Sequence, residues 1–195
     1  MPRKPRQLTE AGIYHIISRG NNKQLLFFET LDFEYYLSLL LRLRCAHRYD
    51  LYHYCLMTNH VHLLIRFYDA EGLQKVMQRI NLNYAKYYKR KYVYHAHVFQ
   101  DRFKSLAIDE DAYLLDCGRY IERNPLKAKL VKDPKEYAWS SYNFYAQGHQ
   151  NSLINVNPLY EDLGERPEDR QNAYRAYVLT ERPYEQLVEE GLAGL

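Results

Sequence analysis

The sequence has few cysteines, and their arrangement excludes several classes of protein. Cys45, Cys55 and Cys117 are an odd number, lie far apart and form no Cys-x-x-Cys pair. A disulfide-based scaffold, a cysteine zinc site and a dithiol redox motif are therefore not expected. Reduced thiols are typical of a protein of the cytoplasm, which is the predicted location.

Long apolar runs are also lacking. The most apolar stretch, residues 37–45, is interrupted by Arg42 and Arg44, whereas a membrane-spanning helix needs about 20 apolar residues in succession. The basic start, residues 1–6, is followed by polar residues where a signal peptide would have its apolar segment. We expect neither a membrane partner nor a secretory leader.

The length and the composition of the chain limit the number of domains and the class of protein. A chain of 195 residues has room for one domain with an appendage. Its 47% hydrophobic fraction includes 21 tyrosines, whose hydroxyl groups often remain half-exposed, and 26% of its residues are charged. This composition excludes a disordered or collagen-like chain.

Charge is segregated along the chain. Residues 150–195 hold nine acidic residues and four arginines, a balance of −5, and the total of +3 leaves +8 for residues 1–149. The densest basic stretch, residues 75–104, is interleaved with seven tyrosine and phenylalanine residues. Its cations are Lys75, Arg79, Lys86, Lys89, Arg90, Lys91, Arg102 and Lys104.

Cations beside aromatic rings suit single-stranded nucleic acid, because the cations neutralise phosphates and unpaired bases stack on the rings. A duplex would offer no bare bases to those rings. The alternative interpretation is a solvated basic helix whose tyrosines pack on the core, and for any single tyrosine it is the more common outcome. The cluster as a whole favours nucleic acid.

The order of the predicted elements indicates the fold. Alternation, helical periodicity and turn residues predict strands over 12–19, 51–57 and 61–67, helices over 31–47, 72–92 and 109–123, and a strand or hairpin over 97–108. This order matches the ferredoxin-like split β-α-β plan, an α+β fold. We expect an antiparallel sheet with helices on one face, extra C-terminal helices, a domain over 1–148 and an acidic, helical extension over 149–195.

A pair of histidines is the candidate metal site. His60 and His62 are two residues apart at the start of a predicted strand, so both rings point to the same side of the sheet. Two imidazoles with open positions suit a divalent ion, Mn²⁺ or Mg²⁺, completed by water and phosphate oxygen. Such a pair also arises by chance, and the second one, His95 and His97, is interpreted as part of a surface loop or as phosphate contacts.

A tyrosine on a late helix is the candidate nucleophile. Tyr120 and Asn124 are four residues apart and share one helix face. A phenol can attack a phosphodiester and hold the cut strand as a phosphotyrosine, and the Asn124 carbonyl oxygen could be a third metal ligand. The competing interpretation is a packing tyrosine followed by an ordinary Asn-Pro helix stop.

Two segments together resemble a known family. Residues 57–64, MTNHVHLL, and residues 120–128, YIERNPLKA, are similar to the motifs of single-tyrosine HUH transposases, closest to REP-associated tyrosine transposases. Residues 14–22 resemble the first strand and turn of that group. The resemblance covers about residues 8–145 and implies the HUH nuclease version of the ferredoxin-like fold.

The resemblance also implies an activity. It implies a DNA transposase, that is, a single-stranded DNA endonuclease and strand transferase that recognises DNA hairpins. His60 and His62 would bind the divalent ion, Tyr120 would become linked to the 5′ phosphate, and Asn124 would be a helper ligand. The basic N-terminal arm and the helix 72–91 would contact the hairpin, and Arg19 would also bind DNA. The cations of the N-terminal arm are Arg3, Lys4 and Arg6.

Two questions stay open at this level. Members of the group act either as monomers or as homodimers that exchange the tyrosine helix. The same fold could also serve a binding protein without cleavage activity, or a nicking enzyme of the replication-initiator type.

Overall fold

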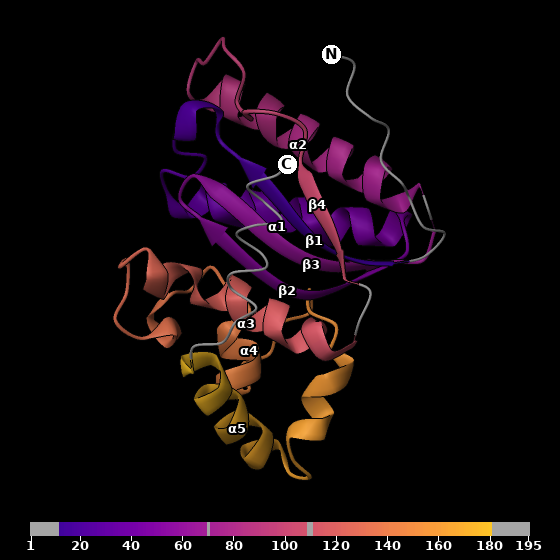
Figure 1. Cartoon of the computed structure of the whole chain (residues 1–195). Helices are drawn as coiled ribbons and strands as arrows, with labels where there is room; N and C mark the ends of the chain where they lie inside the picture. Colours follow the sequence, from indigo (N-terminus) through magenta and orange to yellow (C-terminus); the bar gives the residue numbers. More distant parts are fainter. Residues whose placement is uncertain (1–11, 70, 109–110, 181–195) are drawn as a thin grey trace.

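The computed structural model describes residues 12–69, 71–108 and 111–180, except for the side chains of residues 111 and 112. Four strands form one antiparallel sheet in the order β2-β3-β1-β4 (Figure 1). The strands are β1 (Gly12–Arg19), β2 (Tyr49–Met57), β3 (His60–Phe67) and β4 (Lys104–Ile108). The helices are α1 (Thr30–Ala46), α2 (Gly72–Lys91), α3 (Asp111–Lys127), α4 (Tyr142–Gln147) and α5 (Pro167–Leu179).

The short connection at Thr58 and Asn59 makes β2 and β3 a hairpin, in which Met57 lies opposite His60. β1 then pairs with β3, so that Arg19 lies opposite His60 and Ile17 opposite His62. The last residue of β2, Met57, and the last residue of β1, Arg19, therefore both lie beside His60, the first residue of β3. The α+β architecture expected from the sequence is confirmed.

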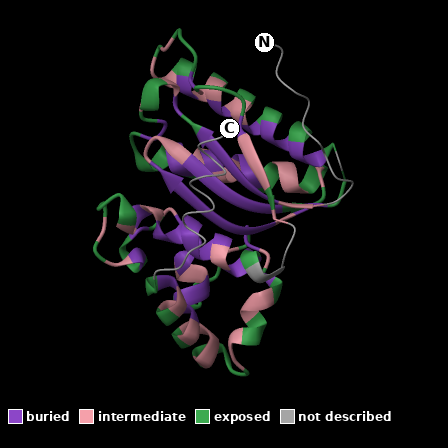
Figure 2. Cartoon of the chain, viewed as in Figure 1, coloured by how far each residue is buried: buried purple, intermediate pink, exposed green. Residues whose placement is uncertain are grey.

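Helices cover both faces of the sheet: the two helices of the ferredoxin-like plan share one face, as expected, and the extra C-terminal helices lie on the other. α1 and α2 lie on one side, and α3, α4 and α5 lie on the other (Figure 1). The physical reason is visible in β2, where every residue from Leu51 to Met57 is buried (Figure 2). A strand buried on both faces must be covered on both faces.

Buried residues on the two sides of β3 belong to different hydrophobic clusters. Alternate residues of β3, Val61, Leu63 and Ile65, pack in a large cluster with the apolar face of α2. Leu64 points the other way, into a smaller cluster that contains Tyr120 of α3. The period of two along β3 therefore aims His60 and His62 towards α3.

The strand predicted over 97–108 is shorter than expected. Only Lys104–Ile108 forms β4, and Phe99 contributes a single bridge to Gly20. His95 and His97 are exposed in the preceding loop, as expected for a surface segment.

Residues 149–180 pack closely against the rest of the chain, and the remainder of the predicted helical extension, 181–195, lies outside the described residues. The described part contains a 3-10 helix, Pro158–Leu163, and α5. Buried Asn157 donates its amide to the His53 ring of β2, with 3.0 Å between Nδ2 and Nε2, and buried Tyr174 of α5 bonds to Glu122 of α3. The boundary at 148 stays a prediction, but hydrogen bonds between buried side chains cross it.

Candidate active site

The two predicted metal-binding histidines begin strand β3. His60 is half-buried and His62 is only 3% exposed. Their ring centroids are 4.9 Å apart, with the planes nearly perpendicular. The structure therefore brings both imidazoles to one place, as their spacing predicts.

Each of these rings uses its Nδ1 atom within the protein. His60 Nδ1 lies 2.6 Å from Asn59 Oδ1, and His62 Nδ1 lies 2.9 Å from His15 Nε2. Because a carbonyl oxygen only accepts, His60 donates from Nδ1 and keeps the lone pair on Nε2. In metal sites the second nitrogen of a ligand histidine is held by such a partner. The contacts thus leave Nε2 of each ring as the atom for a metal ion.

Burial keeps the rings neutral. It lowers the pKa of His15 to about 3, and burial together with the nearby Arg19 charge lowers the pKa of His60 to about 4. The pKa of His62 is lowered well below its usual range, first by burial and then by the neighbouring His60 and His15. Neutral imidazole is the form that binds a metal ion.

Tyr120 lies against the same rings. Its ring centroid is 5.7 Å from that of His15 and 5.8 Å from that of His62, in edge-on arrangements. It is 6% exposed, and the Nζ atom of Lys127, two helical turns later, is 5.0 Å from its ring centroid. The late helix and the histidine strand therefore meet within one chain.

His15 is the site residue that sequence reasoning missed. It is fully buried on β1 opposite Leu64, one strand away from the pair. A signal was present, because His15 interrupts the apolar run of Tyr14, Ile16 and Ile17 in the middle of the strand, ahead of the strand's polar end. Its pairing with His62 depends on the order of the strands in the sheet, which the sequence pattern does not reveal.

Asn124 is turned toward its own helix. Its amide nitrogen donates to the backbone carbonyls of Tyr120 and Ile121, at 2.9 and 3.2 Å. No hydrogen bond between Asn124 and either imidazole occurs in the described part of the chain. Its carbonyl oxygen is the atom that could reach a metal ion, so its role as third ligand stays a prediction.

The tyrosine helix is fixed by a buried polar network around Glu122. The carboxylate lies 2.9 Å from His53 Nδ1 and accepts from the hydroxyl groups of Ser141 and Tyr174, at 2.5 and 2.7 Å. Gly118 permits the close approach of α3 to β2, because a Cβ there would lie 2.5 Å from His53 Nε2. β2, α5 and the segment before α4 together hold Tyr120 in place.

The donor set fits an ion completed by the substrate. Within the three described ranges, no group of three or more His, Cys, Asp and Glu side chains is arranged to hold a metal ion. Two neutral imidazole nitrogens, with their other nitrogens already partnered, instead leave coordination positions for oxygen. This is the arrangement expected of an ion that also binds a phosphate.

Comparison with known families covers more than half of the sequence. Residues 9–124 match the model of the family described as "Transposase IS200 like". The chain belongs to the IS200-like transposase family. Family membership confirms the resemblance found in the motifs and makes the protein a member of a group of DNA-processing enzymes.

Structural comparison agrees on the fold. A solved structure of a REP-associated tyrosine transposase bound to a REP hairpin is similar to this IS200-like transposase with a TM-score of 0.64. The two share 14% identity, and the match covers 80% of this chain and 98% of the other. No curated protein matches the sequence.

The cations expected to contact DNA fall into different environments in this transposase. Arg19 at the end of β1 is exposed, and so are three cations of α2: Lys86, Lys89 and Arg90. Lys91 is used internally, because its Nζ lies 2.5 Å from Glu29 and 2.6 Å from Asp32. Lys91 therefore belongs to the packing between α1 and α2.

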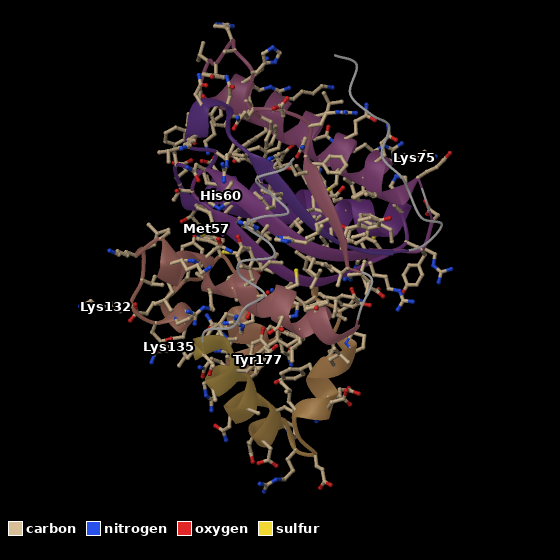
Figure 3. The ribbon with its side chains drawn as sticks, in the orientation of Figure 1. Met57, His60, Lys75, Lys132, Lys135 and Tyr177 are labelled. Atoms are coloured by element: carbon tan, nitrogen blue, oxygen red, sulfur yellow. The ribbon has the colours of Figure 1, made fainter. Side chains whose placement is uncertain are left out.

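The remaining cations are dispersed. Lys75 forms an ion pair with Glu71 and lies on the opposite side of the molecule from His60 (Figure 3). Arg79 bonds to His47, Arg102 is exposed in the loop before β4, and Lys104 is half-buried in β4. Arg3, Lys4 and Arg6 lie outside the described residues.

The tyrosines of the basic stretch do not present a row of bare rings. Tyr84 and Tyr88 are 0% and 3% exposed and donate to the backbone carbonyls of Leu26 and Leu25. For these two rings the expectation of base stacking is wrong, because they form the apolar side of α2. No helix in the described ranges is long and apolar enough to cross a membrane.

Proposed function

We propose that this transposase cuts single-stranded DNA with Tyr120, holds one end as a 5′-phosphotyrosine and transfers that end to another strand. The observation that carries the proposal is the meeting of Tyr120 with His62 and His15, at 5.8 and 5.7 Å between ring centroids. Family membership supports the transposase activity. The tyrosine mechanism rests on this geometry and on the motif resemblance.

The residues of the site have complementary tasks. His60 and His62 would hold a divalent ion, Mg²⁺ or Mn²⁺, through their Nε2 atoms, with Asn124 as a further ligand. When bound, such an ion polarises the scissile phosphate and orients it. Asn59 and His15 fix the two rings, and exposed Arg19, opposite His60 in the sheet, offers a charge to the same DNA strand.

In the covalent step the Tyr120 Oη–phosphorus bond forms and the bond from phosphorus to the 3′ oxygen breaks. The phenol loses its proton and the departing 3′ oxygen gains one. Transfer reverses the step with a new 3′ hydroxyl, so no high-energy cofactor is required. The Lys127 ammonium, 5.0 Å from the ring centroid, places a positive charge beside the proposed nucleophile.

The DNA substrate in this proposal is a hairpin with a single-stranded flank. The solved REP-associated tyrosine transposase that shares the fold is bound to a hairpin. The exposed cations of α2, Lys86, Lys89 and Arg90, supply charge for a stem. Tyrosine and histidines come from one chain here, so we propose that one subunit is sufficient for cleavage.

The test is formation of a covalent adduct. End-labelled hairpin DNA incubated with the protein and Mn²⁺ should give a labelled protein band that survives denaturation and that chelator prevents. His60→Ala should abolish it. Tyr120→Phe should also abolish it, whereas Tyr113→Phe, an exposed tyrosine of the same helix, should leave it unchanged.

If Tyr120→Phe forms the adduct at the rate of the unchanged protein, the proposed nucleophile is wrong. If hairpin DNA binds but never forms an adduct, with or without chelator, the protein is a binding module without cleavage activity.

A further inference from the structure

A lysine-rich surface follows the tyrosine helix directly. Over residues 127–136 four side chains are exposed lysines, which we call the α3-end lysine surface: Lys127, Lys129, Lys132 and Lys135. The two acidic residues of this stretch, Asp133 and Glu136, accept hydrogen bonds from backbone N–H groups and form a capping box. Their carboxylates are committed to the turn, although Asp133 also pairs with Lys135 at 3.1 Å.

The backbone under this surface is hydrogen-bonded to the end of α3. Ala128 and Leu130 donate to the carbonyls of Asn124 and Pro125, at 2.9 and 3.0 Å. Lys129 adopts a φ of 55°, the left-handed conformation that often ends a helix. These bonds wrap the chain around the end of α3 and turn the lysines outward.

Both ends of the surface are attached to the active site. At its start, Lys127 contacts the Tyr120 ring. At its end, Tyr137 packs in the same cluster as Tyr120 and Met57 and donates to the Leu56 carbonyl at 2.7 Å. Met57 lies opposite His60 in the hairpin. The surface is thus held beside the strand ends that carry the histidines.

Figure 3 shows the same relation. Lys132 and Lys135 lie on the side of the molecule where Met57 and His60 are labelled, and Lys75 lies on the opposite side. α2, with its own exposed cations, covers the other face of the sheet (Figure 1). The protein therefore has two basic regions separated by the sheet.

We propose that the α3-end lysine surface binds the single-stranded DNA that continues from the scissile phosphate, while α2 serves the hairpin stem. This inference rests on the proposed function, because it takes the scissile phosphate to lie at Tyr120. A strand attacked at Tyr120 must leave the site, and these lysines are exposed cations at the end of α3 that are joined to the site through Lys127 and Tyr137. Flexible ammonium groups bind phosphates as point charges and do not read bases. Binding of the flank should therefore be independent of its sequence.

The experiment compares two DNA molecules on protein that cannot cleave. In a Tyr120→Phe background, fluorescence anisotropy measures binding of a labelled hairpin with a single-stranded flank and of the same hairpin with a blunt end. The test variant is Lys129→Gln with Lys132→Gln, which leaves Lys127 at the nucleophile unchanged. The matched control is Arg42→Gln with Arg48→Gln, two exposed cations on the α1 side.

Loss of two phosphate contacts to a single strand should lower the slope of log affinity against log salt by about 1.4 and weaken binding about tenfold or more at 0.1 M salt. We expect this loss for the flanked hairpin only, and the same loss when the flank sequence is scrambled. The control variant should lose no flank-specific affinity.

Equal loss on both DNA molecules, or no loss, would overturn the inference. Lower thermal stability without weaker flank binding would also overturn it, because the lysines would then serve only the negative end of the α3 dipole. The outcome is separable from that of the proposed function, since adduct formation is measured on protein that retains Tyr120.

Discussion

At the scale of single residues, the site depends on a histidine that need not touch the substrate. His15 lies fully buried between its own strand and α3, and it meets both His62 and Tyr120. The contact joins His62 Nδ1 and His15 Nε2, and the tautomer in which His62 donates leaves its lone pair on Nε2, where a metal ion can use it. His15 is therefore a positioning residue for the proposed metal site.

Replacing His15 should weaken metal binding without removing a ligand. His15→Leu is expected to lower Mn²⁺ affinity by about 10- to 100-fold, the usual effect of losing the partner of a ligand histidine. His15→Gln keeps an accepting oxygen and should restore part of the affinity. Electron paramagnetic resonance of free Mn²⁺ in a titration measures this directly.

The control is His97→Gln, a histidine in an exposed loop, which should bind Mn²⁺ like the unchanged protein. If His15→Leu is folded and binds Mn²⁺ with unaltered affinity, His15 does not position His62.

At the scale of elements, α3 is the helix whose placement matters most, and the C-terminal segment secures it. Glu122 faces inward and is held by hydroxyl groups from Ser141 and Tyr174. Arg123 donates to the Val178 carbonyl of α5 at 2.7 Å. The described part of the acidic extension thus has a structural task, which its composition alone did not indicate.

Removing one hydroxyl group tests this attachment. Tyr174→Phe takes a hydrogen bond from a buried carboxylate and should lower the free energy of unfolding by about 1.5–3 kcal/mol. Tyr160→Phe, which loses a bond to the Tyr145 carbonyl and does not contact Glu122, should cost about 1 kcal/mol. Urea denaturation gives both values.

Hydrogen exchange then separates the two variants. Amide protons of α3 should exchange faster in Tyr174→Phe and remain unchanged in Tyr160→Phe. Unchanged exchange of α3 in both would mean that α5 does not secure the tyrosine helix.

A second contact between elements, made by Asp32 between α1 and α2, predicts that the free energy of unfolding depends on pH. Burial alone would raise the pKa of Asp32, but hydrogen bonds from Lys91, Tyr92 and the Phe28 backbone outweigh it and lower the pKa to about 2. The carboxylate thereby joins the start of α1 to the end of α2. A lowered pKa stabilises the folded state at pH values above the usual value of 3.8, and this contribution is lost as the pH falls towards 2.

Asp32→Asn should therefore be less stable at neutral pH and should lose less stability between pH 4 and pH 2 than the unchanged protein. Urea denaturation across that range measures both effects. The exposed Asp162→Asn serves as the control. Parallel stability curves for Asp32→Asn and the unchanged protein would contradict the assignment.

At the scale of the whole molecule, local patterns predicted more than long-range relations did. Alternation in β3 correctly placed His60 and His62 on one side. The predicted helix carries Tyr120, but its expected stop at Asn124 is wrong, because α3 continues through Pro125 to Lys127. The role of Lys91 and the partner of His62 depend on contacts between residues 47 or more apart in sequence. Such contacts follow from strand order and helix packing, which periodicity does not encode.

The two-sided cover of the sheet shows the same limit. The continuous burial of β2 includes His53, whose ring nitrogens lie within hydrogen-bond distance of Glu122 and Asn157, and the sequence does not tell which helices cover which face. The tyrosines of α2 were ambiguous for a related reason, since a phenol serves equally well as a buried hydrogen-bond donor and as an exposed stacking surface.

The most direct test of the account identifies the residue that carries the cut DNA. The protein is incubated with hairpin DNA and Mn²⁺, the adduct is digested with nuclease and protease, and the peptide that bears a nucleotide is sequenced by mass spectrometry. The account predicts a 5′-linked nucleotide on Tyr120 and on no other of the 21 tyrosines. A nucleotide on a different residue would contradict it.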